Sequence, residues 1–510
     1  GLQAGIFTDN THTKARIRRI ETQRLQNALD AGNIVVVAGF QGQTESGEIT
    51  TLGRGGSDTT AVALASAMKH ESSGRFAETQ CQIFTDVDGG FTTDPRIVPG
   101  ARKVPTISYE ELLELTSMGA GVMHSRSIEF ASKFGVPFEV RNSFGDSPGT
   151  WVIPDTEWTR QTPVCGVAIV KEEARIRIAE VPDQPGVSQR IFGSLAERKI
   201  VIDMIAQSAG RAGKADIGFT LLKGDLPLAL EILRPIASEL GASITYVDSV
   251  SKVSIVGAGM RTHTGVAASM FNTLAEEDIN IRLITTSEIK ITVLVDRRDG
   301  VRALKAVHDA FGLHVLKLPV EQTKPFATTS QSPGHLTTKP TSSLDEMESI
   351  VVTDIASDTS QARITISDFP DVPGNCAKIF SAIALAGVNV DMIVQSSDDN
   401  GVSELTFTVP RSDLERAYEQ TQLTFQKISP HSKALTDAEI AKVMIYGVGI
   451  RSQTDVVKTM FGALAEQGIN IDMISTSEIC VSVVVHQKHV ENAVNALRRA
   501  FGLHINPVNY

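Results

Sequence analysis

An internal repeat is the feature that most constrains how this chain can fold. Val181–Gly186 (VPDQPG) recurs 188 residues later as Phe369–Gly374 (FPDVPG), and Phe311–His314 (FGLH) recurs 190 residues later at 501–504. Each copy also contains a weaker repeat with a period of about 80 residues. Four related units therefore occupy residues 164–510.

Each unit shows the same order of predicted elements: strand, turn, helix, strand, strand, helix. In the first unit, residues 174–178 alternate in polarity, 182–186 supply a turn, and 187–199 repeat apolar residues at helical spacing. This order is typical of a ferredoxin-like βαββαβ sandwich. We expect four such domains, at residues 164–245, 246–320, 349–435 and 436–510.

The first 150 residues indicate a different, α/β domain. Apolar stretches without alternation predict buried strands of a parallel sheet, in which ligands bind at the carboxyl ends of the strands. Strands are expected at 33–38, 80–85 and 138–141, and helices at 21–31, 110–118 and 128–134. Residues 145–163 form the expected domain boundary, and 321–348, rich in Thr, Ser, Pro and Lys, form an expected flexible linker.

Composition excludes several classes of protein. A net charge of −11 argues against nucleic acid as a partner. The absence of a long apolar run or signal peptide argues against a membrane, and four scattered cysteines argue against a zinc or disulfide framework. We therefore expect a cytoplasmic protein. The chain begins at Gly1 rather than methionine, so we also expect part of the N-terminal domain to be missing.

Residues 49–69 combine a short β-prone piece, a glycine-rich turn with Arg54, and a helix. Ser57 and Asp58 are expected to cap that helix. Glycines allow a ligand to approach the backbone, a helix N-terminus attracts anions, and an arginine matches a carboxylate or phosphate. Two interpretations stay open on these residues alone: an anion-binding turn, or an ordinary strand–turn–helix junction.

Four motifs in a fixed order resemble the aspartate kinase family, which has the amino-acid kinase fold. The downstream units resemble ACT domains in two pairs. The motifs are GFQG at 39–42, TTLGRGGSD at 50–58, TDVDG at 85–89 and TTDPR at 92–96. The resemblance implies that residues 1–150 are the C-terminal part of an amino-acid kinase domain, with a parallel sheet, followed by four ferredoxin-like ACT domains.

The resemblance also implies the reaction. Aspartate kinases transfer the γ-phosphoryl group of ATP, with Mg²⁺ carried by the nucleotide, to the side-chain carboxylate of L-aspartate. Arg54 and Asp58 would be the catalytic pair, with Arg54 on the substrate carboxylates and Asp58 on its ammonium group. The implied aspartate site comprises Phe40, Arg54, Gly55, Ser57 and Asp58, and the implied nucleotide site comprises Thr85, Asp86, Phe91 and Arg96.

ACT domains imply feedback inhibition by an amino acid, here lysine and/or threonine, and a homodimer formed through these domains. A turn before a helix offers N–H groups to a carboxylate, and an aspartate could accept an ammonium group. The candidate effector residues are Asp183, Gly186, Asp203 and Gln207 in the first unit and Asp371, Gly374, Asp391 and Gln395 in the third. A purely structural role for the Pro-Asp-x-Pro-Gly turns is the alternative.

Two other functions compete with the kinase. One is an amino-acid-sensing regulatory protein with a kinase remnant, suggested by the expected missing segment and by Gly121, where many family members carry lysine. The other is a kinase for glutamate or a nucleotide, against which the four ACT-like units argue. His124 is expected to pack or cap a helix rather than to act in catalysis.

Overall fold

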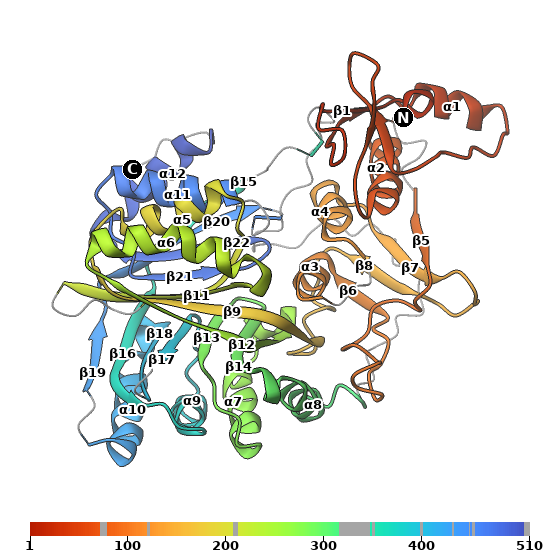
Figure 1. Ribbon diagram of the computed structural model, residues 1–510. Coiled ribbons are helices and arrows are strands. Elements are labelled where there is room, and N and C mark those ends of the chain that lie inside the picture. The colour runs from red at the N-terminus through yellow and green to blue at the C-terminus, as the bar shows by residue number, and fades with distance from the viewer. Residues whose placement is uncertain are drawn as a thin grey trace. The chain divides into compact units, whose positions relative to one another are not determined.

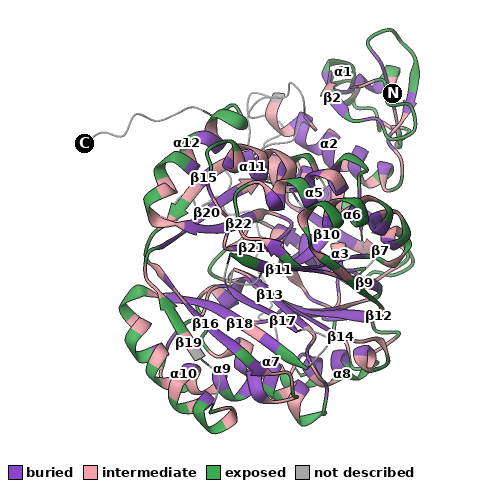
Figure 2. Cartoon of the chain, turned by 60° about the vertical axis from the view of Figure 1, so that its left-hand side comes forward, coloured by how far each residue is buried: buried purple, intermediate pink, exposed green. Residues whose placement is uncertain are grey.

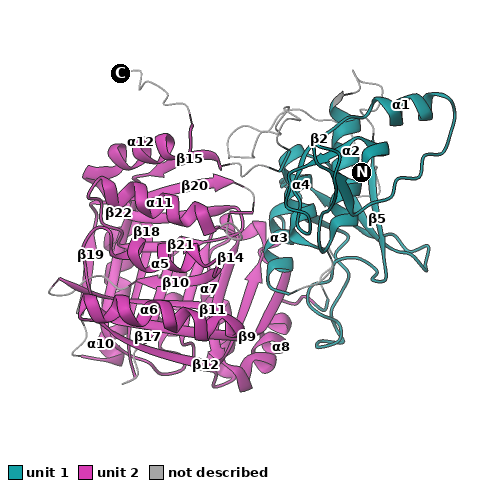
Figure 3. Ribbon diagram, turned by 45° about the horizontal axis from the view of Figure 1, so that its top comes forward, with its two compact units in different colours: residues 1–161, 314–351 teal, residues 162–313, 352–510 magenta. Residues whose placement is uncertain are grey.

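The computed structural model describes residues 1–71, 79–119, 123–207, 213–315, 347–348, 352–397, 401–430, 433–447, 449–450 and 454–503 (Figure 1). These residues form two compact units, coloured separately in Figure 3. The first unit comprises residues 1–161 and 314–351, and the second comprises 162–313 and 352–510. In the described part of the chain, no helix is both long enough and apolar enough to cross a membrane.

The first unit contains two four-stranded sheets. The first sheet has the order β2-β1-β3-β4, and the second has the order β5-β7-β8-β6. The strands are β1 (Ile6–Thr8), β2 (Ile17–Ile20), β3 (Gln41–Gln43), β4 (Ile49–Thr51), β5 (Cys81–Thr85), β6 (Thr106–Ser108), β7 (Phe138–Asn142) and β8 (Thr150–Ile153). The α/β class is confirmed, but the sheets are mixed: β5/β7 and β6/β8 are parallel, whereas β7/β8 is antiparallel.

The helices of this unit lie close to their predicted positions. Ser108 begins α3 with a reciprocal capping box to Glu111, which satisfies two N–H groups at the helix start. Gly135 ends α4 in the left-handed conformation, with φ of 60°. The helices are α1 (Gln23–Asp30), α2 (Gly56–Glu71), α3 (Tyr109–Ser117) and α4 (Ser125–Phe134), after a short 3₁₀ turn, η1 (Leu2–Ala4).

The strand expected at residues 33–38 does not form. Ile34 is 95% exposed and Val36 is 92% exposed, and the segment has no regular secondary structure. A strand is stable only when its backbone groups pair with a neighbour, and both described sheets of this unit are built from other strands. The apolar composition of the segment predicted a buried strand without showing what would cover it.

The first ACT pair contains ten main elements. The first ACT unit consists of β9 (Gly166–Pro182), α5 (Val187–Glu197), β10 (Ile202–Gln207), β11 (Lys214–Leu222), α6 (Leu226–Leu240) and β12 (Ser243–Val256). The second unit adds α7 (Val266–Glu276), β13 (Leu283–Ser287), β14 (Lys290–Asp296) and α8 (Gly300–Ala310). Short 3₁₀ turns precede α6, α7 and α8: η2 (Lys223–Asp225), η3 (Ala258–Arg261) and η4 (Arg297–Asp299).

The second pair repeats this order with its long strands divided. Its third unit has β16 (Gln361–Pro370), α9 (Asn375–Leu385), β17 (Ile393–Ser397), β18 (Val402–Pro410), α10 (Leu414–Ile428) and β19 (Lys433–Asp437). Its fourth unit has β15 (Val352–Asp358), β20 (Ile440–Gly447), α11 (Thr454–Glu466), β21 (Met473–Thr476), β22 (Cys480–His486) and α12 (Val490–Ala500). The turns η5 (Arg411–Asp413) and η6 (Gln487–His489) precede α10 and α12.

The two long strands β9 and β12 are each shared by the first and second ACT units. The second half of β9 pairs with β11, whereas its first half pairs only with the end of β12, next to β14. The last strand of the second unit therefore comes from the start of the first. In the second pair, β15 plays the same part for the fourth unit by pairing with β20.

The four ACT units associate in the order first with fourth and second with third. Strand β13 pairs antiparallel with β17, which joins the second and third ACT units within one ten-stranded sheet that also contains the strands of the first. Helices α5 and α11 meet through Phe192 and Phe461, whose ring centroids are 5.7 Å apart, and α7 and α9 meet through Phe271 and Phe380 at 5.4 Å. Figure 2 shows the resulting layers, with two buried layers of strands between two layers of helices.

Methionines lie at the centre of these layers, as expected of core residues. Met204, Met392 and Met473 belong to one buried cluster between the two layers of strands, and none is more than 2% exposed. A larger core joins the first and fourth units into one hydrophobic body. The side-by-side pairing is therefore held by apolar burial as well as by hydrogen bonds.

Candidate functional site

The turn before α2 is shaped by two glycines in the left-handed conformation. Gly53 has φ of 83° and Gly55 has φ of 72°, so Arg54 lies between two positions that favour glycine. Helix α2 begins at Gly56. Ser57 and Asp58 therefore lie within its first turn rather than before it, which corrects the predicted capping position. Asp58 still contributes a negative charge beside the N-terminal end of the helix.

Close packing gathers the implied aspartate-site residues around this helix start. A Cβ atom on Gly55 would lie 2.3 Å from Cβ of His124, and one on Gly56 would lie 2.9 Å from the Phe40 ring. Phe40 has φ of 72°, an uncommon conformation for a bulky residue. Its N–H donates to Oγ1 of Thr60 at 3.1 Å. Phe40, Gly55 and the first turn of α2 are thereby fixed to one another.

His124 caps helix α4, as predicted, by accepting the N–H of Arg126 at 3.3 Å. Burial lowers the pKa of His124, the neighbouring cations Arg126 and Arg54 lower it further, and Asp58 raises it. Burial raises the pKa of the Asp58 carboxyl, and His124 lowers it. The helix start thus presents an exposed guanidinium and a half-buried carboxylate, opposite charges that match an amino-acid zwitterion.

The residues implied for the nucleotide lie elsewhere in the unit. Thr85 ends β5 and donates from its hydroxyl to Asp86 at 3.1 Å. Arg96 forms a two-point ion pair with Asp94, and its side chain is 87% exposed. Phe91 makes an isolated bridge with Lys103. Among the described residues, no hydrogen bond or ion pair joins this group to Arg54 or Asp58, and Gly121 lies outside the described residues.

We expect Gly55→Ala to disrupt the turn. The added methyl group would collide with His124, and a left-handed alanine costs about 1–2 kcal/mol. The KM for aspartate should rise by about tenfold, since 1.4 kcal/mol corresponds to that factor. Steady-state kinetics and thermal unfolding would measure both effects. Gly145→Ala is the matched control, because a Cβ there meets nothing within 4 Å; equal behaviour of the two variants would contradict the prediction.

Activity should also depend on the protonation of Asp58. Because burial raises its pKa, this carboxylate becomes protonated at a higher pH than an ordinary aspartate, whose pKa is about 3.9. It then loses its attraction for an ammonium group. We expect kcat/KM for aspartate to fall on the acid side as the pH drops through this raised pKa. Asp58→Asn should lower kcat/KM and remove this dependence, and an unaltered pH profile would refute the assignment.

The second compact unit contains a cleft between the second and third ACT units. Its cavity volume is about 10 Å³, which is room for about one water molecule. Gly374, with φ of 87°, precedes α9 on one wall, and Gln395 lies on β17. On the other wall, Arg282 lies 3.7 Å from Asp371. Burial raises the pKa of Asp371, and its hydrogen bond with Asn280 lowers it.

The equivalent cleft lies between the first and fourth ACT units. Asn470 donates to the Asp183 carboxylate at 2.9 Å, and the Gln207 amide donates to the backbone oxygen of Ile471 at 2.6 Å. Gly186, with φ of 92°, precedes α5. Asp183 and Gln207 of the first unit thus meet residues of the fourth, just as Asp371 of the third unit meets residues of the second.

Asp203 and Asp391 have different surroundings. Asp391 pairs with Lys442 at 2.7 Å, and Asp203 pairs with Lys252, which also binds Glu173 at 3.1 Å. Both lysines are buried. These carboxylates are already neutralised within the protein. Asp183, whose printed partner is the neutral amide of Asn470, differs from them in this respect, whereas Asp371 lies near Arg282.

The two clefts differ at one equivalent position. Asp472 of the fourth unit stands where the second unit has Arg282. Burial raises the pKa of Asp472, the Arg363 guanidinium lowers it, and the nearby Asp183 and Asp437 raise it again. Arg363 binds Asp472 at 3.1 Å and Asp437 at 3.0 Å. Among the described residues, the cleft of the first and fourth units therefore has three carboxylates around one guanidinium.

The described charges differ in the cleft of the second and third units. Arg282 lies 3.2 Å from Asp296 and 3.7 Å from Asp371, and Arg175 contributes a second positive charge near Asp371. Arg298 also lies 3.8 Å from Asp296. Among the described residues, guanidinium groups therefore outnumber carboxylates here, the reverse of the other cleft.

Sequence reasoning missed the partner residues of both clefts. Asn280 and Asn470 occupy equivalent places in the repeat, in Ile279–Ile281 and Ile469–Ile471, so the signal was present. The repeat did not show that these residues of the even-numbered units complete sites in the odd-numbered units.

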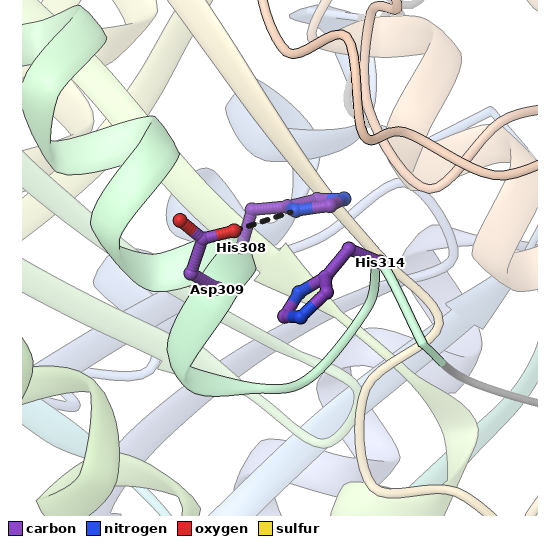
Figure 4. A group of neighbouring side chains, drawn as sticks. All are labelled: His308, Asp309 and His314. Atoms are coloured by element: carbon purple, nitrogen blue, oxygen red, sulfur yellow. Dashed lines mark ion pairs between the residues drawn. The ribbon is translucent and has the colours of Figure 1, made fainter.

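Figure 4 draws His308, Asp309 and His314. Nδ1 of the buried His308 lies 3.7 Å from the exposed carboxylate of Asp309, within the second compact unit. His314 belongs to the other compact unit.

Comparisons with known proteins agree with this architecture. Residues 1–142 match the amino acid kinase family, and residues 179–234, 253–311, 367–425 and 443–501 match the ACT domain. An aspartate kinase of Stutzerimonas stutzeri is 47% identical over 315 residues, which are 61% of this chain and 74% of that protein. An aspartokinase of Helicobacter pylori is 46% identical over 317 residues, 61% of this chain and 76% of that protein.

A solved structure extends the likeness to the whole chain. The crystal structure of aspartate kinase from Synechocystis covers 100% of this chain and 83% of its own, with 37% identity and a TM-score of 0.60. A phosphotransfer domain joined to four ACT domains defines the class of feedback-regulated amino-acid kinases. This chain belongs to the aspartate kinase family. The resemblance found in the sequence, the fold class and the kinase function are thereby confirmed.

Proposed function

We propose that the start of α2 is the aspartate-holding half of the active site. In the family's reaction the side-chain carboxylate oxygen of aspartate attacks the γ-phosphorus of ATP, giving 4-phospho-L-aspartate and ADP. The observation that carries the proposal is the convergence of Arg54, Asp58 and Phe40 on one helix N-terminus. Arg54 would bind a carboxylate of the substrate, and Asp58 would bind its ammonium group.

Phosphoryl transfer depends on positioning and on neutralising charge more than on covalent chemistry. A guanidinium and a helix N-terminus can both stabilise the negative charge that two anionic reactants bring together. Thr85, Asp86, Phe91 and Arg96 are the proposed nucleotide side, with Mg²⁺ arriving on ATP. The support is their position at and after the carboxyl end of β5.

We further propose that each ACT cleft binds one inhibitory amino acid. A backbone turn before a helix offers N–H groups to its carboxylate, and Asp183 or Asp371 accepts its ammonium group. The excess negative charge around Asp472 favours lysine in the cleft of the first and fourth units. The guanidinium groups near Asp371 and Asp296 disfavour a second ammonium group and so favour threonine in the other cleft.

We also propose that the protein forms a homodimer through its ACT domains and that it is located in the cytoplasm. The ACT clefts form within one chain, so a second chain would not be needed to complete them.

A hydroxamate assay on the full-length protein tests this function. Aspartate and ATP should yield the acyl phosphate, which hydroxylamine traps, while glutamate should not. Lysine and threonine should each inhibit, and each should bind its own cleft in calorimetry. Turnover without inhibition by either amino acid would contradict the effector proposal and leave the kinase assignment intact.

A further inference from the structure

Two residues from the end of the expected linker, Met347 and Glu348, pack into the first compact unit. Met347 is fully buried, and the Glu348 side chain is 9% exposed. Their N–H groups donate to the backbone oxygens of Arg18 at 2.8 Å and Ile17 at 3.1 Å, beside strand β2. Lys133 of α4 donates to the backbone oxygen of Met347 at 2.8 Å. Met347 and Glu348 are therefore docked residues, whereas 321–346 lie outside the described residues.

Glu348 holds the guanidinium of Arg126 through both of its carboxylate oxygens. The distances are 2.5 Å from Nε and 2.6 Å from Nη2, a planar two-point arrangement that an arginine makes well. The Glu348 carboxylate also accepts the N–H of Ile17. The Arg126 side chain is only 18% exposed. This is a largely buried ion pair, in which losing one partner leaves the other charge uncompensated.

The same guanidinium reaches the substrate turn. Its Nη1 donates to the backbone oxygen of Leu52, and its Nη2 donates to that of Ala15 at 2.6 Å. Leu52 immediately precedes Gly53, where the turn that carries Arg54 begins. Arg126 also follows His124, which packs against Gly55. Arg126 therefore holds the backbone just before the turn directly, and it is also connected to Gly55 through the nearby His124.

We propose that Glu348 is a positioning residue for the aspartate site, because its carboxylate fixes the Arg126 guanidinium that holds the backbone before Gly53. The inference rests on the proposed aspartate site.

Glu348→Gln tests the inference, because it keeps the size of the side chain and removes its charge. We expect the KM for aspartate to rise about tenfold, typical of a lost charge-assisted hydrogen bond, while kcat and the KM for ATP stay within about twofold. Arg126→Lys should act in the same direction, since lysine keeps the charge but lacks the planar fork.

Glu45→Gln is the matched control, because Glu45 forms an exposed ion pair with Arg19 at 3.2 Å in the same unit. It should behave like the wild type. An unchanged aspartate KM in Glu348→Gln would overturn the proposal. So would a parallel loss for aspartate and ATP with a lower Tm, which indicates a purely structural role. If Arg54→Ala retains normal aspartate kinetics, the aspartate site itself fails; if Arg54→Ala is inactive and Glu348→Gln is normal, only the positioning role fails.

Discussion

Replacing Arg54 with alanine should abolish turnover while the protein stays folded. Arg54 is exposed on a turn between Gly53 and Gly55, so removing its side chain leaves no cavity and no buried charge. The loss of one donor aimed at developing charge typically costs about 100-fold to 1,000-fold in kcat. We expect at least that loss in kcat/KM for aspartate, with an unchanged Tm.

Arg24→Ala provides the matched control for this experiment. Arg24 is an exposed arginine on α1 of the same unit, so its removal changes the net charge equally. It should leave kcat/KM within about twofold, in the range of ordinary surface substitutions. Calorimetric titration with aspartate separates binding from chemistry. Near-normal kcat/KM in Arg54→Ala would remove this residue from the active site and with it the proposed orientation of the substrate.

Exchanging the charges of the two effector clefts should exchange their ligands. In Asp472→Arg, the cleft of the first and fourth units would lose its excess negative charge, and we expect its Kd for lysine to rise at least about tenfold. In Arg282→Asp, the other cleft would gain the charge pattern that now favours lysine. The double variant should therefore bind lysine where threonine bound before. Calorimetry with each amino acid measures these affinities.

Two further variants keep this experiment decisive. Asp472→Asn removes the charge without facing Arg363 with a second cation, so it tests the prediction even if Asp472→Arg folds poorly. Glu491→Arg reverses a charge on the exposed face of α12 in the same ACT unit and should leave both affinities unchanged. Norleucine, which has the length of lysine without its second ammonium group, should not distinguish the two clefts. A lysine affinity that ignores all changes at Asp472 and Arg282 would refute the charge argument.

The repeat predicted the identity of the ACT units but not their partners. Periodic apolar residues and Pro-Asp-x-Pro-Gly turns specify each strand–turn–helix locally, and the observed elements follow them closely. Side-by-side association uses residues such as Phe192 and Phe461, which are alike in all units. Local patterns therefore could not say that the first unit meets the fourth. The partner residues Asn470 and Asp472 were missed for the same reason.

The kinase unit shows a similar division. The motif around Arg54 predicted a glycine turn and a helix, both of which are present. The contact of His124 with Gly55 joins residues 69 positions apart, and the ion pair of Arg126 with Glu348 joins residues 222 apart. Such contacts depend on tertiary packing that no local pattern records. The strand predicted at 33–38 was wrong because the prediction rested on apolar composition alone and identified no partner strand.

The association of first with fourth and second with third places the two proposed effector clefts in one polypeptide. If all four units were identical in the cleft, both clefts would respond to the same molecule. Because Asp472 and Arg282 occupy separate clefts, we expect a change at either to alter one response and spare the other. Divergence of duplicated units at such positions would turn a single sensor into two sensors with different ligands. On this proposal, the activity would depend on the joint abundance of two amino acids rather than on either one.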